Sequence, residues 1–146
     1  MEKKEYRWKL GDLKNIKKNG LKVFSTFSCG GGSSMGYKLA GYDLLGNCES
    51  DPQMMKIYRK NHNPIYPFLM DIRDFNKMEN LPDELFDLDI FDGSPPCSVF
   101  SIAGDREKAW GKEKAFRKGQ AKQSLDDLFF HYLDAVERLR PKIFVA

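Results

Sequence analysis

The hydrophobic positions along the chain form short apolar runs that alternate with amphipathic stretches. KVFSTF (22–27), YDLLGNCES (42–50) and IYPFLM (65–70) are rich in apolar, β-branched or aromatic residues, as in buried strands. Residues 85–92 form another apolar run, and KIFVA (142–146) begins a fifth. Five such runs separated by helical patterns predict a parallel sheet wrapped by helices, with right-handed crossovers.

Capping and turn residues place helices between these runs. A helix that runs through Leu39 can be capped by either Ser33 or Ser34 and ended by Gly41. Residues 51–61 predict a second helix, with aspartate as the N-cap and proline in the first helical position. Ser124, followed by Asp127, resembles a capping box in front of a third helix. The apolar face of that helix comprises Leu125, Leu128, Phe129, Tyr132, Val136 and Leu139.

Composition narrows the class of protein. The chain has 146 residues, of which 41% are hydrophobic and 31% charged, as is typical of one globular domain. No apolar run approaches the roughly 20 residues of a membrane helix, and the charged N-terminus does not resemble a secretory signal. Three cysteines, none in a CxxC spacing, cannot all pair, which favours a reducing cytoplasm. The two histidines have no metal-ligand neighbours in sequence, so we expect no metal site.

Charge is unevenly distributed along the chain. Residues 1–24 contain eight Lys/Arg and three acidic residues, whereas residues 43–92 contain five Lys/Arg and eleven acidic residues. Residues 104–123, shortly after Cys97, contain seven Lys/Arg and three acidic residues. A basic segment beside a candidate nucleophile favours a polyanionic substrate. The alternative is a solvated surface loop.

Candidate ligand groups follow each of the first four predicted strands. Glycines 30–32 follow the first strand, Glu49 ends the second, Asp71 follows the third, and Cys97, preceded by two prolines, follows the fourth. The carboxyl ends of parallel strands meet at one edge of the sheet, where ligands bind. A carboxylate about 20 residues after a glycine-rich turn can accept the ribose hydroxyls of a nucleoside ligand. Met35 stands where a dinucleotide fingerprint needs its third glycine, which disfavours NAD.

Each of these groups also has a structural interpretation. Glu49 can cap the helix that follows it, Asp71 can cap a turn near Asp74, and Cys97 can be a small buried residue. However, two prolines fix the backbone before Cys97 and present its side chain at a set place above the sheet edge. A thiol in that place indicates covalent chemistry.

Five segments in this order, FSCGGGSSMGYKLAGY, NCESD, MDIRDF, GSPPCSVFS and DDLFF, resemble the first five motifs of the cytosine-C5 DNA methyltransferases. The resemblance covers roughly residues 22–146, and the Pro-Cys motif is its most specific part. It implies an α/β, Rossmann-like fold of the S-adenosylmethionine-dependent methyltransferases, with a parallel sheet, helices on both faces and truncation after strand five. Residues 1–20 would then be a basic N-terminal extension. Residues 21–146 would be the N-terminal part of the catalytic domain, without the C-terminal strands and the DNA-recognition domain.

The resemblance also implies the residues of the cofactor site. Those expected to hold S-adenosylmethionine are Phe27, Cys29, Gly30, Gly32, Glu49, Ser50, Asp71, Ile72, Ser94, Pro96 and Leu128. Ser94 and Pro96 would lie at the edge of the site near the methyl group. Three positions depart from the family pattern: Cys29 replaces a usual glycine, Ser50 a large side chain that often packs on adenine, and Ser98 a common glutamine. The first departure bears on how tight the glycine-rich turn can be.

The same resemblance implies the reaction. The Cys97 thiolate attacks C6 of cytosine, C5 takes a methyl group from S-adenosylmethionine, a proton leaves C5, and the cysteine is eliminated. The target carbon is inaccessible inside a duplex, so the base must be flipped out of double-stranded DNA. The basic segment would close over the DNA, with phosphate contacts from Arg106, Lys108, Lys112, Lys114, Arg117, Lys118 and Lys122.

The residues leave other functions open. A tRNA cytosine-C5 methyltransferase would use the same chemistry, an inactive fragment would only bind S-adenosylmethionine, and a dehydrogenase is disfavoured by Met35. The sequence stops at RPKIFVA, whereas the resembled family continues with a glutamate that assists the attack. We therefore expect the 146 residues alone to be inactive and to bind S-adenosylmethionine weakly, if at all. Ile143, Phe144 and Val145 would be exposed at an unpaired strand edge, through which the fragment would self-associate.

Overall fold

The computed structural model describes residues 8–96 and 127–146. Its centre is a five-stranded sheet in the order β3-β2-β1-β4-β5, in which all neighbouring strands are parallel. None of the helices in these two ranges is long and apolar enough to cross a membrane. In chain order, with η for a 3-10 helix, the elements are η1 (Leu10–Asn15), β1 (Lys22–Thr26), α1 (Gly32–Leu39), β2 (Asp43–Glu49), α2 (Pro52–His62), β3 (Tyr66–Leu69), α3 (Ile72–Lys77), η2 (Asp83–Phe86), β4 (Ile90–Gly93), α5 (Leu128–Leu139) and β5 (Ile143–Val145).

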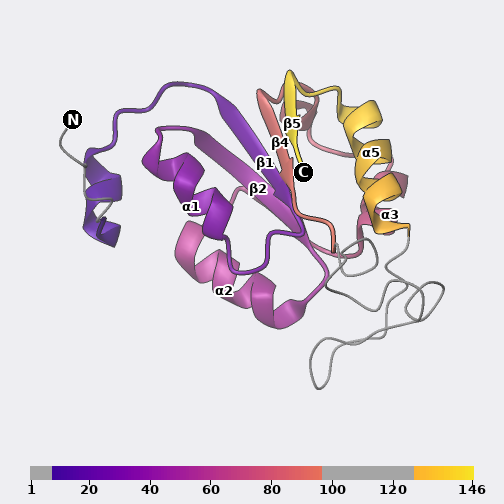
Figure 1. Cartoon of the computed structure of the whole chain (residues 1–146), viewed down its shortest axis with the longest axis horizontal. Coiled ribbons are helices and arrows are strands. Elements are labelled where there is room, and N and C mark those ends of the chain that lie inside the picture. The colour runs from indigo at the N-terminus through magenta and orange to yellow at the C-terminus, as the bar shows by residue number, and fades with distance from the viewer. Residues whose placement is uncertain (1–7, 97–126) are drawn as a thin grey trace, which may run out of the picture.

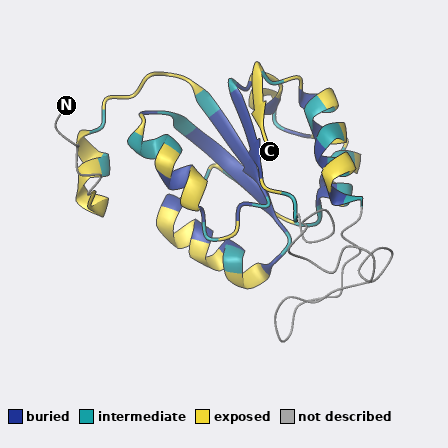
Figure 2. Ribbon diagram, viewed as in Figure 1, coloured by how far each residue is buried: buried dark blue, intermediate teal, exposed yellow. Residues whose placement is uncertain are grey.

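Helices cover both faces of the sheet (Figure 1). α1 and α2 lie on one face, and α3 and α5 pack against each other on the other. The larger core lies between the sheet and the α3–α5 pair and comprises Phe24, Leu45, Cys48, Ile72, Phe75, Leu81, Leu85, Leu88, Phe91, Leu128, Tyr132, Ala135 and Leu139. The smaller core, on the other face, comprises Val23, Leu44, Tyr58 and Ile90. The central strands are buried and the outer helix surfaces exposed (Figure 2), which confirms the expected parallel sheet between two helical layers.

The fourth strand is shorter than its apolar run predicts. The run over 85–92 begins in η2, and β4 starts only at Ile90. Leu85 and Leu88 are buried as the run requires, but from the 3-10 helix η2 and from irregular backbone rather than from a strand. A short apolar run can fill a core from either conformation, so its composition alone does not give the strand boundary.

The N-termini of α1 and α2 are capped in different ways. α1 begins at Gly32 with Gly31 as its N-cap, so the expected cap by a serine is wrong. The chain enters this helix through a left-handed residue, a conformation that glycine adopts at least cost. α2 confirms the expected cap, because the Asp51 carboxylate accepts hydrogen bonds from the backbone N–H groups of Gln53 and Met54, at 2.8 and 3.2 Å.

α3 has no counterpart among the predicted helices. Its six residues are too few to show a helical hydrophobic period. Its N-cap is Asp71, whose carboxylate accepts a hydrogen bond from the Arg73 backbone N–H at 2.8 Å, so the capping interpretation of Asp71 is confirmed. α5 begins at Leu128 with Asp127 as its N-cap, later than the capping-box pattern predicts, and Ser124 lies outside the described residues.

β5 forms an exposed edge of the sheet. It pairs with β4, and Ile143, Phe144 and Val145 expose 58%, 52% and 44% of their surface. Figure 2 shows this exposed strand beside the buried strands of the sheet centre. The exposure expected for these three apolar residues is confirmed.

Candidate cofactor pocket

A pocket opens at the carboxyl ends of β1, β2 and β3. Its volume is about 260 Å³, including its open mouth. The residues that line it are Thr26, Phe27, Cys48, Glu49, Ser50, Met70, Asp71, Ile72 and Leu128. Four segments that are far apart in the sequence therefore bring together most of the side chains expected in the cofactor site: Phe27, Glu49, Ser50, Asp71, Ile72 and Leu128.

Three residues that line the pocket were not among those expected. Thr26, Cys48 and Met70 each lie next to an expected residue at a strand end, so the strand ends themselves were the available signal. The Cys48 thiol donates a weak hydrogen bond to the Met70 carbonyl at 3.5 Å. Burial raises the pKa of the Cys48 thiol far above its usual range, with a further contribution from the Glu49 carboxylate. Cys48 is therefore a packing residue and not a thiolate nucleophile.

The turn after β1 is built from left-handed residues. Phe27 and Cys29 have φ angles of 50° and 47°, and Gly31 has a φ of 89°. Cys29 thus adopts a conformation that glycine would adopt with less strain, so the turn stays tight despite the departure from the family pattern. The Cys29 backbone N–H donates to Glu49 Oε2 at 2.8 Å, which ties the turn to the end of β2.

His62 supports this turn from the end of α2, a role for which the sequence carried no signal. Its imidazole is buried and packs on the Tyr58 ring with the centroids 4.5 Å apart. A Cβ on Gly31 would lie 2.1 Å from His62 Nε2, so only glycine fits between the turn and the imidazole. Burial lowers the pKa of His62, and the Lys38 ammonium lowers it further. His62 is therefore neutral at physiological pH and acts by packing.

Glu49 is held by backbone donors on both carboxylate oxygens. The residue is only 8% exposed. Its Oε2 accepts from the Cys29 N–H at 2.8 Å and its Oε1 from the Asp51 N–H at 2.9 Å. Asp51, not Glu49, caps α2, so the capping interpretation of Glu49 is wrong. A carboxylate has about four acceptor sites, so Glu49 can still accept hydrogen bonds from a ligand.

Asp71 is held differently, by one neighbouring arginine. Asp71 Oδ1 accepts from the Arg73 backbone N–H at 2.8 Å, and Oδ2 pairs with Arg73 Nη1 at 3.1 Å. Ile72 and Leu128, which are 3% and 2% exposed, provide the apolar wall beside this carboxylate. The pocket therefore combines two oriented carboxylates with apolar surface, as a site for a nucleoside requires.

Some of the expected residues do not line this pocket, namely Cys29, Gly30, Gly32, Ser94 and Pro96. Cys29 and the glycines form the turn above it, and α1 starts at Gly32. Ser94 is exposed and Pro96 half-buried in the segment after β4. Cys97 and the expected DNA-binding residues of 104–123 lie outside the described residues.

Asp92, a buried carboxylate near the end of β4, was not among the expected site residues. It is 7% exposed and accepts hydrogen bonds from Ser33 Oγ at 2.8 Å and from the Tyr37 hydroxyl at 3.3 Å. Burial, and then the Asp92 charge, raises the pKa of Tyr37 to about 12. Asp92 thereby joins α1 to the strand that leads into Ser94 and Pro96. Its position at a predicted strand end was the only available signal.

The doubly wound parallel sheet, with a pocket across its strand ends, defines a Rossmann-like domain. One solved structure with this fold is that of a prophage-encoded E. coli protein described as a DNA modification methyltransferase. It superposes with a TM-score of 0.56 and 24% sequence identity, over 86% of this chain and 31% of that one. The two chains therefore share one Rossmann-like fold.

The family is shown by sequence. The model of the C-5 cytosine-specific DNA methylases matches residues 21–146, and the chain belongs to this family. The resemblance carried by the five motifs is thereby confirmed.

Curated relatives are type II methyltransferases. M.NgoPII of Neisseria gonorrhoeae is 30% identical over 132 residues, which are 88% of this chain and 33% of the relative. M.HindV of Haemophilus influenzae is 32% identical over 127 residues, 86% of this chain and 36% of the relative. M.Sau96I of Staphylococcus aureus is 31% identical over 138 residues, which are 92% of this chain and 29% of the relative. The chain thus spans about a third of the length of these relatives.

Proposed function

We propose that this chain provides the cofactor-binding and nucleophile-bearing part of a DNA cytosine-C5 methyltransferase that uses S-adenosylmethionine. The observation that carries the proposal is the pocket itself. It gathers Glu49, Asp71 and the apolar Phe27, Ile72 and Leu128 from segments that are distant in sequence. Membership of the C-5 cytosine-specific DNA methylase family supports the same reaction.

The chemistry of the pocket fits the adenosine part of S-adenosylmethionine. The Glu49 and Asp71 carboxylates are acceptors for hydroxyl and amino groups, and apolar side chains between them suit the faces of a base. When bound, S-adenosylmethionine supplies an activated methyl group. The residues of this chain orient the nucleoside and exclude water from its apolar side.

We assign the covalent step to Cys97. Its thiolate adds to C6 of a cytosine flipped out of the duplex, and the electron pair of the C5–C6 double bond makes C5 nucleophilic. After C5 has gained the methyl group, its proton leaves and the C6–S bond breaks, which restores the aromatic ring and the thiolate. The reaction needs a reduced cysteine, so we place the protein in the cytoplasm, where thiols stay reduced.

Double-stranded DNA is the proposed partner, held by the seven basic residues of 104–123 through its phosphates. Because the chain spans about a third of its relatives, we expect the 146-residue polypeptide by itself to transfer no methyl groups. We also expect it to self-associate through the exposed β5 edge, since apolar edge strands pair readily with a second copy.

Calorimetric titration of the polypeptide with S-adenosylmethionine, S-adenosylhomocysteine and NAD tests the cofactor assignment. The proposal expects saturable binding of the two adenosyl compounds and none of NAD. Selective binding of NAD would contradict it. Incubation with DNA and labelled S-adenosylmethionine tests the second expectation, and measured transfer of label would show that the polypeptide is active by itself.

A further inference from the structure

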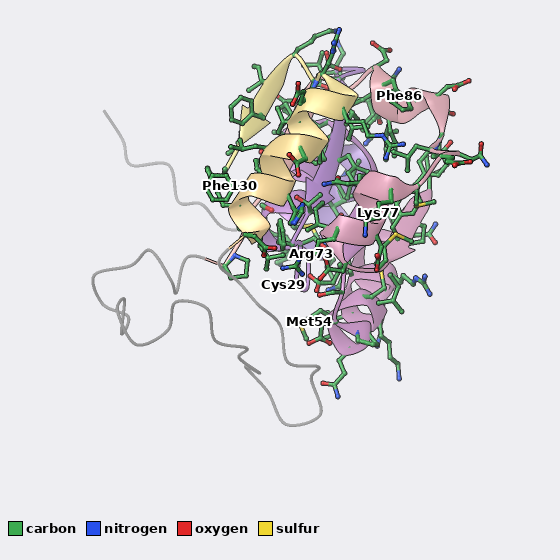
Figure 3. The ribbon with its side chains drawn as sticks, turned by 90° about the vertical axis from the view of Figure 1, so that its right-hand side faces the viewer. Cys29, Met54, Arg73, Lys77, Phe86 and Phe130 are labelled. Atoms are coloured by element: carbon green, nitrogen blue, oxygen red, sulfur yellow. The ribbon has the colours of Figure 1, made fainter. Side chains whose placement is uncertain are left out.

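A single guanidinium joins the first residues of α3 and α5. Arg73 Nη1 lies 3.1 Å from Asp71 Oδ2, in the N-cap of α3. The same side chain donates from Nη2 to Asp127 Oδ1, and from Nε to Asp127 Oδ2 at 3.4 Å, in the N-cap of α5. Figure 3 shows Arg73 beside the first turn of α5, on the side of the molecule where Cys29 also lies. Arg73 therefore bridges two carboxylates that are 56 positions apart in sequence.

The two helix starts that Arg73 joins form one wall of the pocket. Asp71 and Ile72 line it from α3, and Leu128 lines it from α5. A shift of one helix start relative to the other would move an apolar wall residue away from the Asp71 carboxylate. The bridge by Arg73 opposes such a shift at the pocket end of the helix pair.

A second arginine holds the far end of the same pair. Arg138, in the last turn of α5, donates from Nη1 to the backbone carbonyls of Phe75 and Asn76, at 3.2 and 2.6 Å, and from Nη2 to that of Met78. These carbonyls lie at the end of α3, and none of these residues lines the pocket. The helix pair thus has one arginine at each end, and only Arg73 contacts a residue of the pocket wall.

The geometry of the bridge needs arginine. A guanidinium presents five N–H donors in a rigid plane and can meet two carboxylates at once, whereas a lysine ammonium is a single point charge. Arg73 supplies donors to both Asp71 oxygens, one from its backbone and one from its side chain. The direction of the Asp71 carboxylate is therefore set largely by Arg73.

We propose that Arg73 is a positioning residue of the cofactor pocket, which orients Asp71 and sets the spacing between Ile72 and Leu128 by bridging Asp71 to Asp127. It acts on the adenosine part of the ligand through these residues and does not touch it. The inference rests on the proposed function, since it assumes that the pocket holds an adenosyl compound.

The test is an NMR titration of the 146-residue protein with S-adenosylhomocysteine, which measures weak as well as tight binding. Arg73→Gln should weaken binding about tenfold, the equivalent of one charge-assisted hydrogen bond. Arg73→Lys keeps the charge but cannot bridge both carboxylates, so its affinity should lie between those of the wild type and Arg73→Gln. Arg138→Gln is the matched control: it should lower the unfolding temperature and leave the affinity unchanged.

The substitution Asp127→Asn provides a second, independent variant for the same titration. It removes the bridge from the α5 side without altering any pocket-lining residue, and should also weaken binding. Combined with Arg73→Gln, it should add little, because both substitutions break the same bridge. Wild-type affinity in Arg73→Gln, or equal losses in Arg73→Gln and Arg138→Gln, would overturn the inference alone. No binding of S-adenosylhomocysteine by the wild type would overturn the proposed cofactor site, and the inference with it.

Discussion

The carboxyl edge of the sheet has two unlike halves. Over β1, β2 and β3, carboxylates and apolar side chains surround one pocket, and backbone N–H groups or Arg73 orient the carboxylates. Over β4 and β5, Ser94 is exposed and the edge strand presents its apolar side chains to solvent. The first half has the features of a ligand site, whereas the second leads into Cys97, to which we assign the attack on the base. Binding of the cofactor and attack on the base should therefore be separable by substitution.

Cys97→Ala should separate cofactor binding from attack on the base more fully than any other substitution. In an active preparation it should abolish methyl transfer to DNA, because no other group replaces the thiolate, while cofactor affinity stays nearly unchanged. Methyl transfer is measured as label passed from S-adenosylmethionine to DNA collected on a filter. Cofactor affinity is measured by calorimetry. More than trace methylation by this variant would remove Cys97 from the mechanism, and a parallel loss of cofactor binding would show that the two halves are not separable.

DNA that contains 5-fluorocytosine sharpens the same point. With fluorine at C5 there is no proton to lose from that carbon, and fluorine cannot leave as a cation. The reaction should therefore stop with the base still bound to sulfur. Mass spectrometry should find the adduct on the peptide that contains Cys97. Its absence from an otherwise active preparation would count against covalent attack.

In the half of the edge that holds the pocket, Glu49→Ala should weaken binding of the cofactor without a direct effect on the nucleophile. Loss of a charge-assisted hydrogen bond costs roughly 1.5–3 kcal/mol, which is about a 10- to 150-fold increase in Kd. Calorimetric titration with S-adenosylmethionine measures it. Glu79→Ala, at an exposed acidic position, is the control for loss of charge. Equal affinity of the two variants would assign Glu49 a purely structural role.

A smaller effect is expected at the β5 edge. Phe144→Lys places a charge on the exposed strand and should weaken self-association of the polypeptide about tenfold. Phe86→Lys, at a residue of η2 that is 47% exposed, makes the same change away from the edge and should have no effect. Light scattering over a concentration series distinguishes them. A wild-type protein that stays monomeric at high concentration would exclude pairing through this edge.

The smallest effect concerns pH and the Arg73 bridge. Hydrogen bonding from Arg73 lowers the pKa of Asp127 below its ordinary value of about 3.9. A lowered carboxyl pKa adds stability that is fully present above the unfolded-state value and is lost as pH falls through the folded-state value. The wild type should therefore be slightly more stable than Asp127→Asn at pH 7, and the difference should be lost at an acid pH at which the Asp127 carboxyl is protonated in the folded protein. Urea unfolding at both pH values measures it, and a difference that persists in acid would show that the bridge does not stabilise the fold.

Much of the candidate pocket was predictable because it depends on strand ends. Glu49 and Asp71 follow apolar runs, and in a parallel sheet such positions meet at one edge. The cap of α2 by Asp51 was predictable for a similar reason, since its donors lie two and three residues along the chain. α3 was not predictable, because six residues carry too little pattern. The Gly31 cap was missed because side-chain capping by serine is the commoner arrangement.

The sequence by itself determined the succession of the five strands along the chain, the helices α1, α2 and α5, the edge at which ligand groups meet, and the family, because these depend on local pattern and contiguous motifs. Only the tertiary structure decided which distant side chains hold those groups in place. His62 fits beneath Gly31, Asp92 joins Ser33 to β4, and Arg73 bridges to Asp127. Each of these contacts joins segments that are far apart along the chain. They form only when packing of the helices against the sheet offsets the entropy of closing the intervening loops, and no local pattern records that outcome.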